Sequence, residues 1–555
     1  MKKPFPLFGL LALVLGACAP AQTARPASAP SAPATAAPAA AREPDQALAA
    51  TSRAWWLLDE ATDRIRGTSA DRAYRELLAG KQPKKTVVVA IIDSGVDVGH
   101  EDLHRNVWTN AREIAGNGRD DDGNGYVDDV NGWNFIGGRD GRNVTHDTYE
   151  LTRIYGRLRT QCEAANARTR TECAQYPKIK ADFERKRAEA VQMRQQIRGV
   201  EAAVAQFSSV LRAEIGGDSL TAERVARIQS PRPEVQRARQ VFLQMSAEGI
   251  TPALIARELA SVEGRVEYGF NPDFDPRPIV GDSYADPRDR FYGNPNVQGP
   301  DAEHGTHVAG IVGAERGNNV GVDGIAPAVR IMSIRAVPDG DERDKDVANA
   351  IRYAVDNGAN IINMSFGKSH SPEKRLVDDA VRYADGRGVL MVHAAGNDAA
   401  DLDQENNFPN RDYEGGGSAR HWIEVGASAR GAGDSLVAVF SNYGRKRVDV
   451  FAPGADILST VPGNRYESNS GTSMAAPVVS GLAALIMAYY PGLSTDVVRQ
   501  IILDSATRYP TLRVLRPGRA GGGRVAFSEL SISGGVVNAY AALRLAEQRA
   551  AQPRQ

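Results

Sequence analysis

The segment Thr86-Val-Val-Val-Ala-Ile-Ile92 runs directly into Asp93 and decides the fold class. A run of β-branched and aliphatic residues of this length predicts a buried strand. Similar runs recur along the chain, with helical patterns between them. Further strands are expected at residues 330–337, 360–366, 389–395 and 422–427, and two of the helices at 346–356 and 372–384. This alternation predicts an α/β fold with a mostly parallel central sheet flanked by helices.

The carboxyl ends of parallel strands are where open α/β sheets place their reactive groups. Asp93, Ser365 and Asn397 each stand at or just past the end of an expected strand. We therefore expect the functional site along this edge of the sheet.

Residues 147–265 depart from the alternation, because they are highly charged and show helical periodicity throughout. Their apolar positions follow a heptad-like spacing, which is typical of packed helices. This stripe consists of Met193, Ile197, Val200, Val204, Phe207 and Leu211. We expect a helical hairpin or short bundle whose stripe packs internally, although a partner could also use it. The insertion would divide the α/β domain into residues 86–146 and 266–545, followed by a tail at 546–555.

Composition narrows the functional classes. The 555 residues include 67 basic and 68 acidic side chains, which leaves a formal net charge of −1. Such a balance gives no electrostatic footprint for nucleic acid, so a nucleic-acid partner is not expected. The three cysteines also exclude a disulfide-dense mini-domain and a four-cysteine zinc site.

Cys162 and Cys173 lie eleven positions apart within the insertion. On one straight helix they would be separated by about 16 Å. A disulfide needs Cα atoms within about 7 Å, so a turn must lie between them. The N-terminal residues predict export, and disulfides persist in the oxidising environment outside the cytosol. We therefore predict that the two cysteines are bonded.

The N-terminus has the pattern of a secretory signal over residues 1–17: two lysines, a short apolar run and then small residues. Leu15-Gly-Ala-Cys18 is similar to the lipobox of bacterial lipoproteins, which implies a diacylated Cys18 at the mature N-terminus. The alternative is an ordinary signal peptide with an incidental cysteine. The residue directly after Cys18 is Ala19 and not an Asp. In such lipoproteins, Ala at this position implies an outer-membrane anchor, with the protein facing the periplasm or the exterior.

An Ala-, Pro- and Ser-rich stretch at 18–45 predicts a flexible tether. An N-terminal arm is expected at 46–85, with Trp55, Trp56, Leu57 and Leu58 as its apolar contact to the domain.

Three short motifs carry the chemistry. They are Ile92-Asp93-Ser94-Gly95, His304-Gly-Thr-His-Val-Ala-Gly310 and Gly471-Thr-Ser473-Met-Ala-Ala-Pro477. A serine hydroxyl becomes a good nucleophile when a histidine removes its proton and a buried carboxylate orients that histidine. Ser473 precedes the apolar stretch 474–490, which predicts a buried helix. A serine at a helix start has free N–H groups nearby for a developing oxyanion.

These motifs, in this order, resemble those of the subtilisin-like serine peptidases, the subtilases. The resemblance implies a subtilisin-like three-layer fold and a serine endopeptidase that forms an acyl-enzyme. Asp93, His304 and Ser473 match the family's triad, whereas His307 matches a structural neighbour. Ala394-Ala-Gly-Asn397 matches the oxyanion segment, with Asn397 as the side-chain donor.

The resemblance also implies where a protein or peptide substrate binds. Ser365, Phe366 and Gly367 match the strand that pairs with the substrate backbone. Ala394 and Gly396 would border the specificity pocket, and their small size indicates room for a bulky substrate side chain. The 211 positions between Asp93 and His304 are more than compact subtilases have, because the helical insertion lies between them. Access to the cleft stays open, since the insertion could cover, extend or gate it.

A second departure is that much of the stretch between Cys18 and the first strand is tether. A full inhibitory propeptide of the family is therefore not expected there.

Two calcium sites of structural character are expected. Residues 120–129 place carboxylates around two glycines, and Ca²⁺ prefers such clustered oxygen ligands. The ligands there would be Asp120, Asp122, Asn124 and Asp128. A solvated acidic turn is the alternative. The second site, implied by the resemblance, would use Asp102 and Asn318.

Two other functional classes agree less well with the sequence. A non-catalytic binding lipoprotein could retain the fold, but degenerate relatives usually lose a triad residue and this chain keeps all of them. An α/β-hydrolase esterase would need Gly-x-Ser-x-Gly and the order Ser, Asp, His. Neither feature is present in this sequence.

Overall fold

The structure is a computed structural model that describes residues 54–163, 171–217, 219–431, 433–518 and 523–552. The expected signal segment, Cys18 and the tether lie outside the described residues. The described chain divides into two compact units. One contains residues 154–271, and the other contains the remainder.

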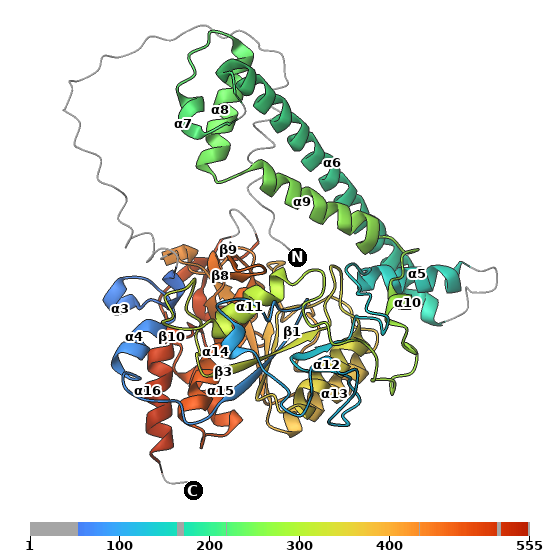
Figure 1. The fold of residues 1–555 in the computed structure, drawn as a ribbon, viewed down its shortest axis with the longest axis vertical. Helices are drawn as coiled ribbons and strands as arrows, with labels where there is room; N and C mark the ends of the chain where they lie inside the picture. The colour runs from blue at the N-terminus through green and yellow to red at the C-terminus, as the bar shows by residue number, and fades with distance from the viewer. Residues whose placement is uncertain (1–53, 164–170, 218, 432, 519–522, 553–555) are drawn as a thin grey trace. The chain divides into compact units, whose positions relative to one another are not determined.

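The larger unit is built on a nine-stranded sheet, ordered β10-β13-β7-β6-β5-β4-β1-β3-β2 (Figure 1). All neighbouring strands run parallel except β10 and β13. The strands are β1 (Val87–Asp93), β2 (Gly132–Asn134), β3 (Val329–Arg335), β4 (Ile361–Met364), β5 (Leu390–Ala394), β6 (Trp422–Ser428), β7 (Val450–Pro453), β10 (Thr507–Arg508) and β13 (Gly535–Val536). The predicted mostly parallel sheet is confirmed, and each strand expected from the sequence is present.

Helices cover both faces of this sheet, because alternate residues of β1 point into two separate cores. Val89 and Ile91 pack with α14, whereas Ala90 and Ile92 pack with α12 and α13. On the first face lie α11 (Glu303–Gly313), α14 (Thr472–Tyr489), α15 (Thr495–Asp504) and α16 (Ala539–Ala550). On the second lie α12 (Asp344–Asp356) and α13 (Lys374–Gly386). The result is the predicted three-layer arrangement.

Helix α14 is long and apolar enough, among the described residues, to cross a membrane. However, 94 % of its apolar window is buried inside the protein. The sheet strands β4, β5, β6 and β7 all contact it. It is therefore the central core helix, which fixes Ser473 at its start.

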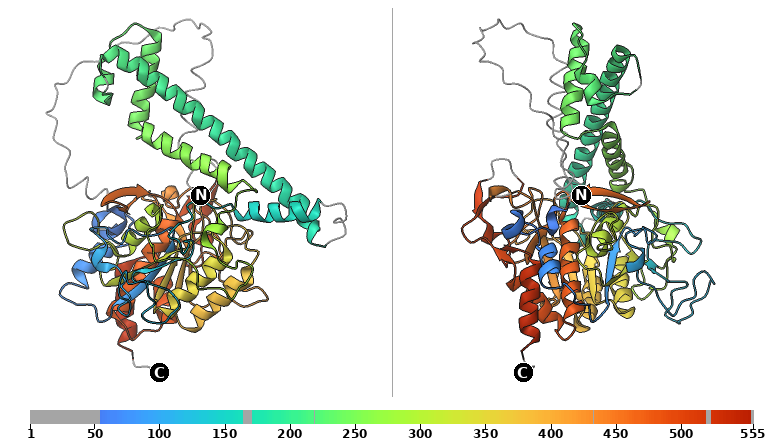
Figure 2. Two further views of the ribbon diagram at one scale, coloured as in Figure 1. Left: turned by 45° about the vertical axis from the view of Figure 1, so that its right-hand side comes forward. Right: turned by 60° about the vertical axis from the view of Figure 1, so that its left-hand side comes forward.

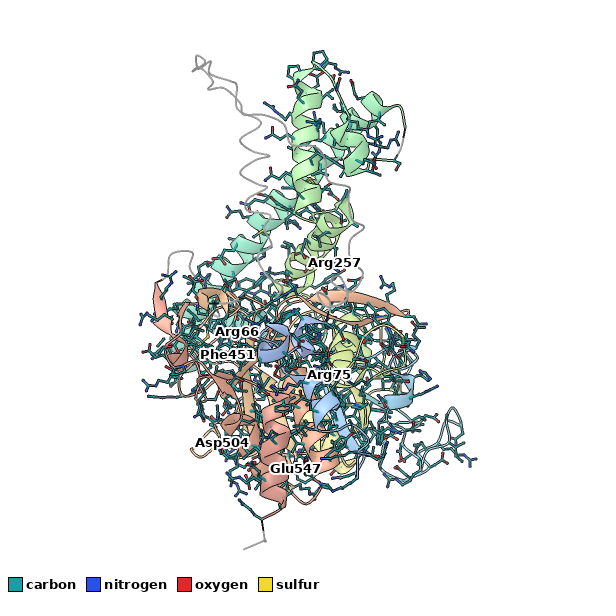
Figure 3. The ribbon with its side chains drawn as sticks, turned by 90° about the vertical axis from the view of Figure 1, so that its left-hand side faces the viewer. Arg66, Arg75, Arg257, Phe451, Asp504 and Glu547 are labelled. Atoms are coloured by element: carbon teal, nitrogen blue, oxygen red, sulfur yellow. A yellow bond between two sulfur atoms is a disulfide. The ribbon has the colours of Figure 1, made fainter. Side chains whose placement is uncertain are left out.

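The N-terminal arm packs onto the first face through η1 (Trp55–Leu57) and α4 (Ala70–Glu76), with the short helix α3 (Glu60–Asp63) between them. The side chains of Trp55 and Trp56 are almost fully buried, and Trp55 Nε1 donates to the Asp456 carbonyl at 3.1 Å. Figure 3 faces this arm, with Arg66 and Arg75 on it, and α16, which carries Glu547. Burial of two tryptophans makes the arm part of the folded domain.

Short elements complete this unit. They are the hairpins β8 (Ile457–Val461) with β9 (Arg465–Asn469) and β11 (Arg513–Leu515) with β12 (Arg524–Ala526), the helix α10 (Arg277–Val280), and the 3-10 turns η2 (His104–Asn106), η5 (Gly433–Ser435) and η6 (Phe527–Glu529).

The smaller unit is helical, as predicted. Figure 2 shows its longest helix, α6 (Tyr176–Ile215), running beside α8 (Pro233–Ala247) and α9 (Pro252–Gly264). The heptad-like stripe on α6 is confirmed as internal packing, since Ile197, Val200 and Val204 share a core with residues of α8 and α9. The other elements are α5 (Glu150–Cys162), η3 (Thr171–Gln175), α7 (Ala222–Ala226) and the π-helical turn η4 (Arg265–Gly269).

The boundaries of the smaller unit differ from the expected 147–265. Asp147 and Glu150 belong to the larger unit, because they pair with Arg343 at 2.7 Å and Lys368 at 2.8 Å. The chain after 265 continues as η4, and Phe270 contacts Phe183 with ring centroids 6.3 Å apart. The structure also joins Cys162 to Cys173 in a disulfide, with Cα atoms 5.6 Å apart.

Candidate active site

Asp93 and His304 come together although 211 positions separate them. Asp93 ends β1 and is 1 % exposed, and His304 is the second residue of α11. His304 Nδ1 lies 2.7 Å from Asp93 Oδ1, which also accepts the Ser94 N–H at 2.8 Å. The start of α11 can approach this closely because residue 305 is glycine: a Cβ there would lie 2.1 Å from the Gly95 carbonyl oxygen. A buried carboxylate on Nδ1 leaves Nε2 of His304 to act as a base.

The second histidine of the motif, His307, has a different environment. It is fully buried, and its Nε2 lies 3.0 Å from the Glu467 carbonyl oxygen. Burial disfavours the imidazolium and lowers the pKa of His307 to about 4. His304 has a side chain that is 42 % exposed. Of the two histidines in this motif, His304 is therefore the one that combines a carboxylate partner with access to solvent.

Ser473 is the second residue of α14, the helix that packs against α11. Its Oγ donates to the Ser365 carbonyl at 3.0 Å, and Ser365 Oγ donates to the Ser473 carbonyl at 2.9 Å. These two bonds hold the start of α14 against the segment that follows β4. The Ser473 N–H is one of the four at a helix start that have no intrahelical acceptor.

Asn397 contacts the same helix start from the segment after β5. Its Oδ1 accepts hydrogen bonds from Thr472 N–H at 2.8 Å and Thr472 Oγ1 at 3.1 Å. Since only the oxygen can accept from an N–H, the orientation of the amide is fixed and Nδ2 points the other way. A methyl group on Gly471 would lie 3.4 Å from Asn397 Nδ2 and 3.6 Å from the Ser473 nitrogen. Two N–H donors thus border one small region beside Ser473.

The predicted substrate-binding segment, Ser365 to Gly367, is fixed by a buried polar chain that sequence reasoning missed. Asn363 in β4 donates to Ser365 Oγ at 3.0 Å, and Ser480 in α14 donates to Asn363 Oδ1 at 2.8 Å. Neither Asn363 nor Ser480 was predicted as a site residue, because each lies inside an otherwise apolar element.

Asn407 is a second residue that the sequence did not indicate. Its Nδ2 donates to the carbonyls of Ala394 and Ala395, both at 3.1 Å. On its other side, a Cβ on Gly367 would lie 2.4 Å from Asn407 Oδ1. The Asn407 side chain therefore lies between the expected backbone-pairing segment at Gly367 and the segment of Ala394 and Gly396, which was expected to border the specificity pocket.

The acidic loop brings together some of its predicted ligands. Oxygen atoms of Asp120, Asp122 and Glu113 lie within 4.8 Å of one another. Glu113, which was not predicted, has a buried Oε2 without a hydrogen-bond partner among the described residues. Arg112 also contacts Asp122 at 2.8 Å.

The other two predicted ligands of this loop use their side chains elsewhere. Both oxygens of Asp128 accept backbone N–H groups, from Asn117 at 3.1 Å and Gly118 at 2.9 Å. Asn124 Oδ1 accepts the Tyr126 N–H at 2.8 Å.

Asp102 and Asn318 also meet, in a different arrangement from that of two metal ligands. Asn318 Nδ2 donates to Asp102 Oδ1 at 2.7 Å, and the Val322 N–H donates to Oδ2 at 3.0 Å. Burial raises the pKa of Asp102 despite these bonds. The carboxylate is thus satisfied by protein donors.

Comparisons with known proteins agree with this geometry. A sequence profile described as the subtilase family matches residues 84–521. The chain is 39 % identical to the thermophilic serine proteinase of Bacillus sp. (strain AK1) over 261 residues, which is 47 % of this chain and 58 % of that protein. It therefore spans little more than half of that relative's length. It is 37 % identical to subtilisin BL of Lederbergia lenta over 216 residues, 39 % of this chain and 74 % of that one.

A solved structure of proteases from Pseudoalteromonas arctica PAMC 21717 is 20 % identical to this chain, with a TM-score of 0.45. That match covers 89 % of this chain and 97 % of the other.

Proposed function

Because this chain belongs to the subtilase family, we propose that it is a serine endopeptidase that forms an acyl-enzyme on Ser473. The observation that carries the proposal is the 2.7 Å contact between buried Asp93 and solvent-accessible His304. His304 lies on α11, which packs against α14, and Ser473 is the second residue of α14. Its substrates are proteins or peptides.

In this mechanism His304 Nε2 removes the proton of Ser473 Oγ as the oxygen attacks the substrate carbonyl carbon. The oxyanion that forms is bound by Asn397 Nδ2 and the Ser473 N–H. The imidazolium, stabilised by Asp93, then protonates the leaving amine, and the peptide bond breaks. Water activated by His304 hydrolyses the ester and restores Ser473.

The proposal is tested by incubating the full chain with an unfolded protein such as reduced casein and locating the cuts by mass spectrometry. We expect internal cleavage by wild type and none by Ser473→Ala. Release of single residues from the chain ends alone would contradict an endopeptidase.

The chain also fits a structural Ca²⁺ ion in the acidic loop. The carboxylates of Glu113, Asp120 and Asp122 would hold it, and an unpartnered buried carboxylate oxygen on Glu113 is the group that a cation would satisfy. The ion would supply stability to the loop and take no part in peptide hydrolysis.

We predict that removing calcium with a chelator lowers the thermal midpoint of the full chain. A ligand at 100 times its dissociation constant stabilises a fold by about 2.7 kcal/mol. Glu113→Gln should weaken the calcium response, whereas Asp128→Asn should keep it, because Asp128 lies outside the group of three clustered carboxylates. A midpoint that does not change with calcium, measured by calorimetry, would contradict the site.

We further propose that the mature protein is a lipoprotein of the outer membrane, anchored through Cys18. This rests on the Leu15-Gly-Ala-Cys18 sequence and on the Ala/Pro-rich tether that follows it. Labelled palmitate should be incorporated into wild type and not into Cys18→Ala, which should leave the membrane fraction. Equal fractionation of both proteins would contradict the anchor.

A further inference from the structure

A buried histidine and glutamate lie directly behind the expected substrate-binding segment. His393 in β5 and Glu424 in β6 are register partners in neighbouring parallel strands. Both are buried, at 0 % and 5 % exposure, and His393 Nδ1 lies 2.9 Å from Glu424 Oε1. The triad does not use either residue, and buried ionisable groups of this kind are costly unless they are paired.

The other ring nitrogen of His393 contacts the substrate-binding segment itself. Nε2 lies 2.9 Å from the Phe366 carbonyl oxygen. A carbonyl oxygen only accepts hydrogen bonds, so Nε2 must carry a hydrogen and donate it. The rings of His393 and Phe366 are also nearly perpendicular, with centroids 6.4 Å apart.

The hydrogen-bond pattern fixes how many protons the pair holds. Glu424 Oε2 accepts the Trp422 Nε1–H at 2.9 Å, which leaves Oε1 for His393. With Nε2–H donating, the Nδ1–Oε1 contact needs one proton between the two atoms. Either an imidazolium faces a carboxylate, or a neutral imidazole accepts from a carboxylic acid. In both arrangements the pair has no net charge, which suits its complete burial.

The hydrogen bond from His393 to the Phe366 carbonyl also sets the direction of the Gly367 N–H group. The peptide bond between Phe366 and Gly367 is trans and planar, so its oxygen and its N–H point in opposite directions. With the oxygen directed at His393, the Gly367 N–H faces away from the β5–β6 pair. The preceding residue, Ser365, is held separately by its two hydrogen bonds with Ser473.

We infer that the His393–Glu424 pair is a positioning unit, which presents the backbone of Ser365–Gly367 to the acyl side of an extended substrate. The inference rests on the proposed endopeptidase function. It assigns His393 no contact with the reacting atoms, so its effect should depend on how far the substrate reaches along this segment.

The test compares two substrates with the same residue at the cleaved bond: a tetrapeptide anilide and a single-residue acetyl ester. His393→Asn retains a donor near Glu424 at the position of Nδ1 but cannot reach the Phe366 carbonyl. In the full chain we expect kcat/KM to fall about tenfold for the tetrapeptide, the effect of one hydrogen bond, and to stay within twofold for the ester. An equal loss for both substrates, or none for either, would overturn the inference.

Glu424→Gln is the matched conservative variant. A glutamine can donate to His393 Nδ1 and still accept from Trp422, so neutral His393 keeps its Nε2–H on Phe366. Its kcat/KM should therefore stay within twofold of wild type for both substrates. An equal loss of kcat/KM with the tetrapeptide and the ester would overturn the inference, even if His393→Asn failed to fold.

Fluorophosphonate labelling of Ser473 separates this inference from the proposed function. The small probe does not extend along Ser365–Gly367, so His393→Asn and wild type should be labelled at the same rate. Absence of labelling in wild type would contradict the peptidase itself. Labelled wild type with an unchanged substrate ratio in His393→Asn would contradict only the positioning role.

Discussion

Replacing His304 by alanine is expected to lower kcat for peptide hydrolysis by about 10⁶-fold, the size of effect recorded for the corresponding change in a subtilisin. The reason is that Ser473 Oγ loses the base that removes its proton, and the leaving amine loses its acid. A tetrapeptide anilide assay with active-site titration of wild type measures this effect.

The matched control for this prediction is His104→Ala. His104 is exposed in η2, where its Nδ1 donates to the Glu101 carbonyl at 2.9 Å and lies 3.5 Å from Glu315 Oε1. Its removal should leave kcat/KM within twofold of wild type. If His304→Ala retained a tenth or more of the wild-type activity, another group would have to act as the base.

Asn397→Ala should lower kcat by about 10²–10³-fold with little change in KM, again a magnitude recorded for a subtilisin. The side chain donates to the oxyanion, which exists in the transition state and not in the bound substrate. Steady-state kinetics on the tetrapeptide anilide would separate the two constants.

Asn397 also accepts two hydrogen bonds from Thr472, so a loss of activity could reflect a disturbed helix start. Asn397→Asp separates these roles, since it keeps an acceptor for Thr472 and loses the Nδ2 donor. It should therefore be as impaired as Asn397→Ala while unfolding at the wild-type temperature. Wild-type turnover in Asn397→Asp would rule out the amide as an oxyanion donor.

Local sequence signals were sufficient for the sheet and for the three motifs. The run Thr86–Ile92 predicts β1 to within one residue, because β-branched residues buried on both faces favour a strand directly. The Ala-rich stretch after Ser473 likewise predicts α14, since a nearly all-apolar helix requires burial all round. Asp93 and His304 follow from motifs that each include the glycines needed for close approach.

Other site residues depend on register and loop paths that no local pattern encodes. His393 and Glu424 are 31 positions apart, and only the pairing of β5 with β6 makes them neighbours. Asn407 lies in an irregular segment, where its contact with Ala394 depends on the path of the loop. Glu113 precedes the acidic loop and meets Asp120 only because the chain folds back there.

The insertion shows why sequence distance predicts so little about the site. Its helix α6 has 40 residues, or about 60 Å of helix. Even so, Asp93 and His304 meet at 2.7 Å. The entropy of closing such a loop grows only logarithmically with length, and the inserted helices bury their own core. The catalytic fold therefore accommodates the insertion without changes to the triad motifs.

The central claim is that Ser473 is an activated nucleophile, and fluorophosphonate labelling of the folded full chain beside Ser473→Ala tests it most directly. The account predicts a single labelled site in wild type, mapped by mass spectrometry to the peptide that contains Ser473, and no label in the variant. A folded wild type that stays unlabelled, or equal labelling of both proteins, would contradict it.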